Sequence, residues 1–246
     1  MTVLKDVAMI AANTGRSKAY LQAMSQFDLA PSFVFVMKED EKLLLPGQSQ
    51  NDKKKTGSNN ASFRNEVLGV TFEPQEPLEN TLQISKIPFK EIYNTDINSS
   101  HVIKEVSSRP EPVFIYSGYG GQILRKGILG TEKKFLHVHG GYLPDYKGST
   151  TNYYSLINDN ECGASSLFLN QEIDCGSILL RRKFSPPEDK KQLDYIYEPI
   201  IRAKVLVETL RAYVDTGVWK NECDNLGGDT YYIMHPFLRH VAILAG

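Results

Sequence analysis

Two histidines and one aspartate are the residues of this sequence whose types and spacing could do chemistry together. His137 and His139 stand one residue apart in FLHVHGGYLPDYKG (135–148), and Asp174 follows in QEIDCGSI. Histidine transfers protons and stabilises developing negative charge near neutral pH, and it also binds metals. A carboxylate beside it could orient the imidazole or accept a proton. The set therefore suits acid–base chemistry or a metal site.

The metal alternative is the weaker of the two. Metal-dependent amidohydrolases use an HxH pair after the first strand of an eight-stranded barrel, and the chain after His139 is too short for the remaining units of about 30 residues each. The later histidines, His235 and His240, lie in a terminal aromatic segment. We predict no metal site. A metal-dependent hydrolase that uses His137 and His139 stays open as an alternative, as do a structural role for His137 and a plain turn role for Asp174.

These residues must be positioned by strand ends. Phe135, His137 and His139 alternate with Leu136 and Val138, so the two histidines should leave one face of a strand that ends at the following glycines. PVFIYSGYGGQIL (112–124) has the same form, an apolar strand that runs into glycines. Ligands of open α/β sheets bind beyond the carboxyl ends of the strands. We therefore expect SGYGG and HVHGG to meet at one edge of a sheet.

Strand and helix patterns alternate along the whole chain. DVAMIAAN (6–13), SKAYLQAMSQFDL (17–29) and PSFVFVM (31–37) predict a strand, a helix and a second, parallel strand. Residues 38–86 read as an irregular insertion, with a helix over ASFRNEVL (61–68). The pattern predicts an α/β protein with an open, doubly wound, mostly parallel Rossmann-like sheet.

The end of the chain is expected to form an extension. We assign residues 1–190 to a catalytic domain and 191–246 to a C-terminal part packed on it. DYIYEPIIRAKVLVETLRAY (194–213) has the periodicity of an amphipathic helix. The tail GGDTYYIMHPFLRHVAILAG (227–246) suits a hairpin or a docked segment. The same apolar surfaces are compatible with a homodimer.

Composition limits the possible partners. The 246 residues are 41% hydrophobic and 23% charged, with a net charge of -1, so no broad basic surface for nucleic acid is expected. The apolar runs are far shorter than the ~20 residues that cross a membrane, and no secretory signal is evident. Three cysteines without a CxxC motif argue against a disulfide framework. We expect a cytoplasmic protein with no membrane partner.

Three segments, in order, resemble the catalytic core of the folate-dependent formyltransferases, the superfamily of glycinamide ribonucleotide, methionyl-tRNA and nucleotide-sugar formyltransferases. SGYGGQIL (117–124) resembles the loop that lines the pterin pocket. HVHGGYLPDYKG (137–148) resembles the pattern Asn-x-His followed by Leu-Pro and a basic turn. GASSLFLNQEIDCGSIL (163–179) resembles the segment that ends in Asp-x-Gly-x-Ile. The resemblance implies a formyltransferase fold.

The resemblance also implies roles for individual residues. His139 would lie beside the formyl carbonyl of 10-formyltetrahydrofolate, the formyl donor, and stabilise the oxyanion. Asp174 would orient this histidine and assist removal of the proton from the attacking amine. The pterin would be held, largely through backbone groups, by Ser117, Gly118, Tyr119, Gly120, Gly121, Gln122 and Ile123 and by Leu169, Asn170, Gln171, Glu172 and Ile173.

The sequence departs from the family at two positions. His137 stands where the family has an asparagine that donates a hydrogen bond to the formyl oxygen. An imidazole N–H can donate as well, and loss of a donor in such a site costs on the order of 10²-fold to 10³-fold in rate. Leu167 stands where several members have a histidine. His137 is thus a third candidate catalytic residue whose role the sequence leaves open.

The acceptor is expected to be a small amine. The chain resembles the small N-formyltransferases that act on nucleotide-linked amino sugars more than the methionyl-tRNA enzymes with their additional β-barrel domain. Tyr154, Tyr231 and Tyr232 could contribute to an aromatic rim, and Tyr142, Ser149, Thr150 and Tyr153 are the candidate substrate-binding residues. Two alternatives stay open: a 10-formyltetrahydrofolate hydrolase and a non-catalytic folate or nucleotide-sugar binder.

Overall fold

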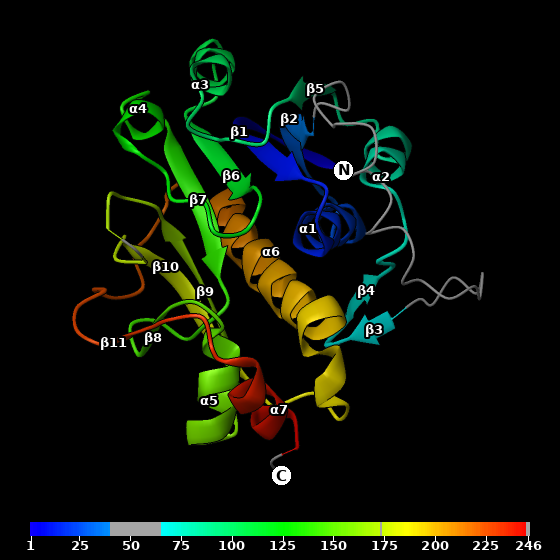
Figure 1. The fold of residues 1–246 in the computed structure, drawn as a ribbon. Coiled ribbons are helices and arrows are strands. Elements are labelled where there is room, and N and C mark those ends of the chain that lie inside the picture. The colour runs from blue at the N-terminus through cyan, green and yellow to red at the C-terminus, as the bar shows by residue number, and fades with distance from the viewer. Residues whose placement is uncertain (40–64, 173, 245–246) are drawn as a thin grey trace, which may run out of the picture.

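A seven-stranded sheet of order β10-β9-β7-β6-β1-β2-β5 forms the centre of the protein in a computed structural model, which describes residues 1–39, 65–172 and 174–244 (Figure 1). Neighbours from β7 through β6, β1 and β2 to β5 are parallel, whereas β9 is antiparallel to β7 and to β10. The strands of this sheet are β1 (Thr2–Ala12), β2 (Leu29–Lys38), β5 (Phe89–Tyr93), β6 (Val113–Ser117), β7 (Lys134–His139), β9 (Cys162–Phe168) and β10 (Ile178–Phe184). The predicted mostly parallel α/β sheet is confirmed.

Helices cover both faces of the sheet. The core on one face contains buried side chains from α1 and α6, which also pack against each other, and the core on the other face contains those of α3 and α4 (Figure 1). A 3-10 turn (Lys190–Gln192) and a π-helical turn (Leu193–Tyr197) lead into α6. The helices are α1 (Gly15–Gln26), α2 (Leu78–Ile84), α3 (Ser100–Ser107), α4 (Lys126–Leu129), α5 (Thr151–Asp159), α6 (Glu198–Thr216) and α7 (Pro236–Leu244).

The strand order reverses between β1 and β6, and this creates a crevice at their carboxyl ends. From β1 the chain steps outward to β2 and β5, and from β6 it steps in the opposite direction to β7. Arg16, in the first turn of α1, bridges the gap: its Nε donates to Ser117 Oγ at 3.1 Å and its Nη2 to the Gly118 carbonyl at 2.5 Å. Such a switch point is where open α/β sheets bind ligands.

The prediction of a helix over residues 61–68 is wrong for residues 65–68, which form no helix. Residues 61–64 lie outside the described residues. Asn65–Val67 is strand β3, which pairs antiparallel with β4 (Val70–Phe72). Leu68 and Gly69 have φ values of 56° and 76°, as a two-residue hairpin turn requires. Buried Phe72 joins the core beside α1. Residues 65–86 are therefore a hairpin and helix α2, not an irregular insertion.

The C-terminal tail is a docked segment rather than a hairpin. Strand β11 (Asp229–Tyr231) pairs in parallel with β8 (Tyr146–Gly148), and α7 packs against α5. The segment that follows α6 thus returns to the sheet edge that carries the HVHGG sequence (Figure 1). The division at residue 190 stays a prediction. None of the helices among the described residues is both long and apolar enough to cross a membrane.

Helix α6 should supply much of the stability of this fold. Leu206 is fully buried in the core between α6 and the sheet, whereas Val214 on the same helix is 43% exposed. Leu206→Ala should lower the free energy of unfolding by about 2–5 kcal/mol, because it leaves a cavity. Val214→Ala should change it by less than about 0.5 kcal/mol. Urea unfolding of both variants measures the difference, and equal effects would contradict the packing described.

The β8–β11 pairing should depend on Gly148. This residue has a φ of 98°, and a Cβ atom there would lie 2.1 Å from the Tyr231 carbonyl oxygen. Gly148→Ala should therefore cost about 1–3 kcal/mol in thermal unfolding and make the tail more sensitive to limited proteolysis. Gly120→Ala is the matched control, since a Cβ at residue 120 meets open space. An intact, protease-resistant tail in Gly148→Ala would refute this assignment.

Candidate active site

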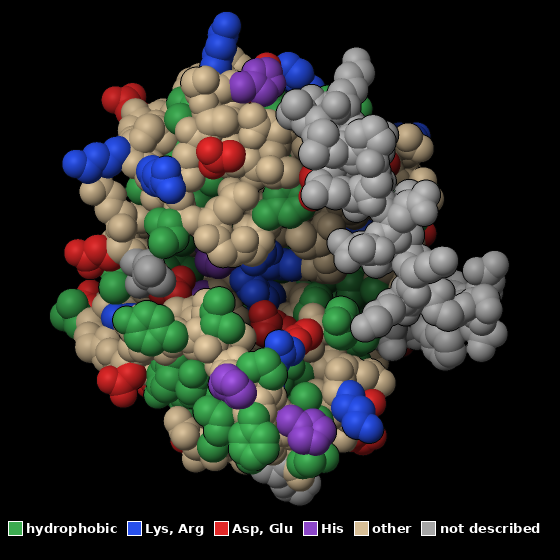
Figure 2. All heavy atoms as spheres, in the orientation of Figure 1, with side chains coloured by type: hydrophobic (Ala, Val, Ile, Leu, Met, Phe, Trp, Pro, Cys, Tyr) green, Lys and Arg blue, Asp and Glu red, His purple; other side chains and the backbone are tan. Residues whose placement is uncertain are grey.

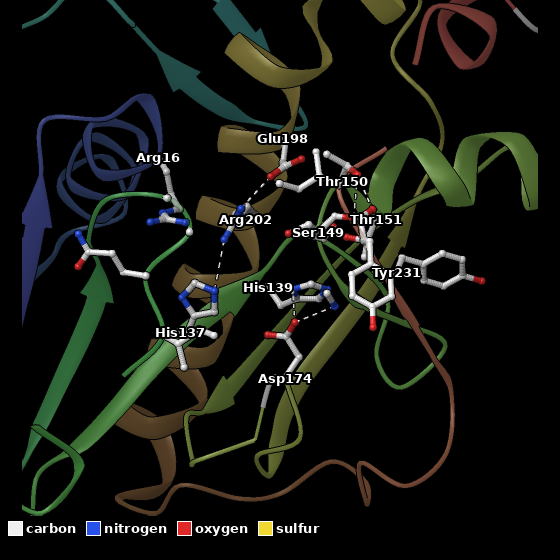
Figure 3. A pocket seen from close by; sticks show the side chains of 18 of the residues that line it. Arg16, His137, His139, Ser149, Thr150, Thr151, Asp174, Glu198, Arg202 and Tyr231 are labelled. Atoms are coloured by element: carbon white, nitrogen blue, oxygen red, sulfur yellow. Dashed lines mark hydrogen bonds and ion pairs between the residues drawn. The ribbon is translucent and has the colours of Figure 1, made fainter. Parts of the chain in front are cut away.

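A cavity of about 510 Å³ lies at the carboxyl ends of β1, β6 and β7. It opens as a hollow in the face shown in Figure 2, with basic and acidic side chains at its bottom. Its walls come from α1, the loops after β6, β7 and β8, helix α6 and the tail segment around β11 (Figure 3). The predicted site residues that line it are Tyr119, Gly120, Gly121, Gln122, Ile123, His137, His139, Ser149, Thr150 and Asp174, together with the rim tyrosines Tyr231 and Tyr232.

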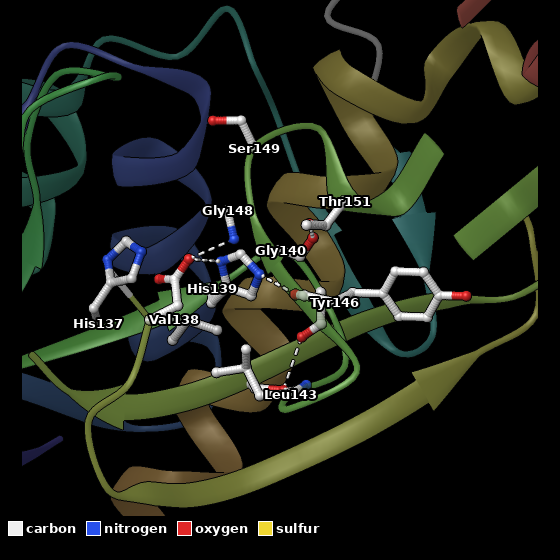
Figure 4. A network of polar contacts seen from close by, with 12 residues as sticks. His137, Val138, His139, Gly140, Leu143, Tyr146, Gly148, Ser149 and Thr151 are labelled. Carbon is white, nitrogen blue, oxygen red and sulfur yellow. Dashed lines mark hydrogen bonds and ion pairs between the residues drawn. The ribbon is translucent and has the colours of Figure 1, made fainter. Parts of the chain in front are cut away.

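His139 and Asp174 meet inside this cavity, although 34 residues that include β8, α5 and β9 lie between them in the sequence. The Nδ1 atom of His139 lies 3.4 Å from Asp174 Oδ2, and the Nε2 atom lies 2.8 Å from the Tyr146 carbonyl oxygen (Figure 4). Because a carbonyl oxygen only accepts, Nε2 carries a proton. A proton between Nδ1 and the carboxylate would make that contact a hydrogen bond.

Asp174 is held in place by contacts from two other segments. The Gly148 N–H donates to its Oδ2 at 2.9 Å. Its backbone has a φ of 51°, in the left-handed region that non-glycine residues rarely adopt. Asn225 secures this turn, because its Nδ2 donates to the Asp174 carbonyl at 2.5 Å and to the Gly176 carbonyl at 2.9 Å. Such local strain is typical of functional sites.

The second glycine of HVHGG lets the chain turn tightly against the His139 ring. A Cβ atom at Gly141 would lie 2.7 Å from His139 Nε2 and 2.7 Å from the Tyr146 carbonyl oxygen. Thr151, at the start of α5, donates its hydroxyl to the Gly140 carbonyl and so fixes the same turn. The glycines therefore allow a buried imidazole to contact backbone on one side and a carboxylate on the other.

Both ring nitrogens of His137 have partners within the protein. Its Nδ1 atom is 3.3 Å from the Tyr116 carbonyl oxygen, and its Nε2 atom is 3.5 Å from Arg202 Nη2 (Figure 3). Burial lowers the pKa of His137 well below 6.5, and the positive charges of Arg202 and Arg16 lower it further. The ring is therefore uncharged at neutral pH.

Arg16, Glu198 and Arg202 also line the cavity, and the sequence analysis did not predict them as site residues. Arg202 on α6 donates from Nε to the Val138 carbonyl at 2.9 Å and from Nη1 to Glu198 Oε1 at 2.7 Å. Burial, together with the charge of Arg202, lowers the pKa of Arg16 to about 10, so Arg16 is still a cation at neutral pH. One signal was available: Glu198 and Arg202 are four residues apart in an otherwise apolar part of the α6 sequence.

Several predicted residues lie elsewhere. Ser117 and Gly118 are buried and contact Arg16 instead of lining the cavity. Residues 169–172 do not line the cavity either. Ile173 lies outside the described residues. Their folate-binding role stays a prediction.

The two tyrosines proposed for the acceptor do not line the cavity. The guanidinium of Arg181 lies 4.7 Å from the centre of the Tyr142 ring, and that of Arg239 lies 4.6 Å from the centre of the buried Tyr153 ring. Tyr142 and Tyr153 are thus packing residues here, because each ring is covered by a cation of a neighbouring segment. Leu167 is buried with Leu143 and Ile178 in a small apolar cluster.

The described residues contain no group of three or more His, Cys, Asp or Glu side chains placed to hold a metal ion. His235 and His240 lie at the surface on and beside α7, and they do not line the cavity that holds His137 and His139. The two cavity histidines contact Tyr116, Arg202, Tyr146 and Asp174, which include a cation and two carbonyl groups. Their ring nitrogens are thus engaged within the protein.

Comparisons with known proteins agree with this architecture, although no family model matches the chain. The chain is 23% identical to a methionyl-tRNA formyltransferase of Listeria monocytogenes over 158 residues. This alignment covers 59% of this chain and 50% of that relative. The chain thus spans about half the length of the curated relatives it matches.

Solved structures share the fold. A sugar N-formyltransferase from Shewanella sp. FDAARGOS_354 superposes with a TM-score of 0.57 at 12% identity over 97% of this chain and 86% of that one. Phosphoribosylglycinamide formyltransferase from Anaplasma phagocytophilum superposes with a TM-score of 0.57 at 14% identity, and the superposition covers 92% of this chain and 96% of that one. The chain is thus similar in sequence to part of the methionyl-tRNA formyltransferases, and it shares its fold with a sugar and a phosphoribosylglycinamide formyltransferase.

Proposed function

We propose that this protein transfers the formyl group of 10-formyltetrahydrofolate to the amine of a small substrate. The observation that carries the proposal is the contact between His139 and Asp174 at the bottom of the cavity. A buried imidazole beside a carboxylate provides the proton transfer that amide formation from an amine requires.

The cavity suits a folate as formyl donor. The loop of residues 119–123 presents two glycines whose missing side chains leave backbone groups open to the cavity. Gln122 fixes this loop, because its Nε2 donates to the Thr95 carbonyl at 2.6 Å and its Oε1 accepts from the Ile97 N–H at 3.1 Å. A rigid wall of backbone donors and acceptors can recognise the polar edge of a flat pterin ring. The assignment of this wall to the pterin is part of the proposal.

The protein residues divide the chemistry between them. The formyl donor supplies an activated carbonyl carbon, which the lone pair of the amine attacks. Asp174 accepts the proton that the amine loses as the new C–N bond forms, and His139 stabilises the negative charge on the former carbonyl oxygen. The His139–Asp174 pair then returns a proton to the leaving nitrogen of the folate as the old C–N bond breaks. Atoms and charge balance without any further reactant.

A nucleotide-linked amino sugar is the acceptor that we propose. Tyr231 and Tyr232 line the mouth of the cavity, where aromatic rings can stack on a sugar or a base. Arg16 and Arg202 give the crevice two positive charges for an acidic substrate. The sugar N-formyltransferase from Shewanella shares the fold over 97% of this chain, which supports the same choice.

His139→Ala should lower kcat for formyl transfer at least about 10²-fold, because the variant loses the acid–base group. Consumption of 10-formyltetrahydrofolate against a panel of nucleotide amino sugars is the measurement. His240→Ala is the matched control, since His240 is exposed on α7 and outside the cavity.

The outcomes separate the alternative functions. Formate release without any amine would identify a hydrolase, and binding of tetrahydrofolate without turnover would identify a binder. Activity that a chelator abolishes would identify a metal-dependent hydrolase. Full activity in His139→Ala would overturn the proposed mechanism.

A further inference from the structure

His137, at the position where the resembling family has an asparagine, has both ring nitrogens in defined contacts. Nδ1 faces the Tyr116 carbonyl oxygen at 3.3 Å, and Nε2 faces Arg202 Nη2 at 3.5 Å. A carbonyl oxygen cannot donate a hydrogen bond, and a guanidinium cannot accept one. Each contact alone therefore requires the same arrangement, with the proton on Nδ1 and the lone pair on Nε2.

Arg202 is rigidly placed for this contact. Its Nε and Nη2 both donate to the Val138 carbonyl, at 2.9 Å and 2.5 Å, and its Nη1 is paired with Glu198 at 2.7 Å. Only 11% of its side chain is exposed. The guanidinium therefore cannot turn away from His137 without breaking buried hydrogen bonds, each of which costs about 1–3 kcal/mol.

We propose that Arg202 is a positioning residue that holds the His137 proton on Nδ1, and that this N–H donates to the formyl oxygen during transfer. The proposal rests on the proposed formyl transfer. His137 lines the cavity beside His139, so its ring and the catalytic pair face the same space (Figure 3). A positive group hydrogen-bonded to Nε2 polarises the ring and makes the Nδ1–H a stronger donor.

The present partner of this N–H can be exchanged. At 3.3 Å, the contact with the Tyr116 carbonyl is longer than the usual 2.9–3.0 Å of an N–H···O bond. A developing oxyanion accepts a charge-assisted hydrogen bond, which is about twice as strong as one to a neutral carbonyl. The donor is thus available when negative charge forms on the substrate, and the ring performs this role without becoming a cation.

The groups around His137 keep it neutral over the working range of pH. Burial is the largest cause of its lowered pKa, followed by the charges of Arg202, Arg16 and His139. Because its pKa lies well below 6.5, a fall in pH through 6.5 does not protonate it, and it should add no limb to the pH profile of kcat. The groups that face His137 are Arg202 from α6, Arg16 from α1, His139 from β7 and Tyr116 from β6. Glu198 from α6 acts indirectly, because it is paired with Arg202. Burial raises the pKa of Tyr116 to about 12.

NMR of protein labelled with ¹⁵N-histidine tests the tautomer without any need for activity. His137, identified by its absence in His137→Asn, should show a protonated Nδ1 and an unprotonated Nε2 and should not titrate near pH 6.5. In Arg202→Met the loss of a positive neighbour and of the donor to Nε2 should raise the pKa of His137 and shift its proton toward Nε2. A wild-type His137 protonated on Nε2 would overturn the proposal.

A double-mutant cycle separates positioning from a merely structural role. Arg202→Met should lower kcat at least about tenfold in the wild type. In a His137→Asn background the same change should cost less than about threefold, because an amide donor has no tautomer to fix. His137→Ala, which has no donor, should lose on the order of 10²-fold in kcat, whereas His137→Asn should retain most of it.

Equal losses from Arg202→Met in both backgrounds would overturn the proposal, since that result would mean that Arg202 only supports the fold. A wild-type protein that consumes no formyl donor would instead refute the proposed function. The tautomer measurement would then still decide whether Arg202 fixes the proton of His137.

Discussion

The site depends on one hydrogen bond, from the Gly148 N–H to Asp174 Oδ2. It joins the end of β8 to the turn after β9, and it holds the carboxylate within 3.4 Å of His139 Nδ1. Neither partner is free to move: Gly148 pairs with Tyr231 of β11, and the Asp174 turn is held by Asn225. The segment after α6 therefore fixes the position of Asp174 from both sides, although His139 belongs to strand β7.

A second constraint is the positive charge that the crevice encloses. Arg16 is held by the neutral oxygens of Ser117 and Gly118, whereas Arg202 is paired with Glu198. Burial and, after it, the two cations make a charged His137 unfavourable and lower its pKa, so a histidine there cannot serve as an acid near neutral pH. It can serve only as a neutral donor or acceptor. This restriction is what makes a histidine compatible with a position at which the resembling proteins have an amide.

The sequence was informative wherever a local pattern determines structure. The strand ends at residues 117 and 139 were predictable because glycines follow buried β-branched and aromatic runs, and His139 and Asp174 were found from spacing and resemblance. Arg16 and Arg202 were not found, because each lies on a helix whose direction into the crevice is set by packing between α1 and α6. That Tyr142 and Tyr153 lie outside the cavity was not predictable either, since the arginine that covers each ring comes from a distant part of the sequence.

The C-terminal tail contributes both to the rim of the cavity and to the backbone pairing beside Asp174. Tyr231 and Tyr232 line the cavity mouth, yet their segment is held by β8, the strand that also ends at Gly148. The Ser149 N–H donates to the Tyr231 carbonyl at 2.9 Å, so the rim and the Asp174 contact are adjacent in the same backbone network. Tyr232 itself is 80% exposed. Substitutions at this rim can therefore change the surface at the opening of the cavity, whereas changes in the β8 backbone would also displace the Asp174 carboxylate.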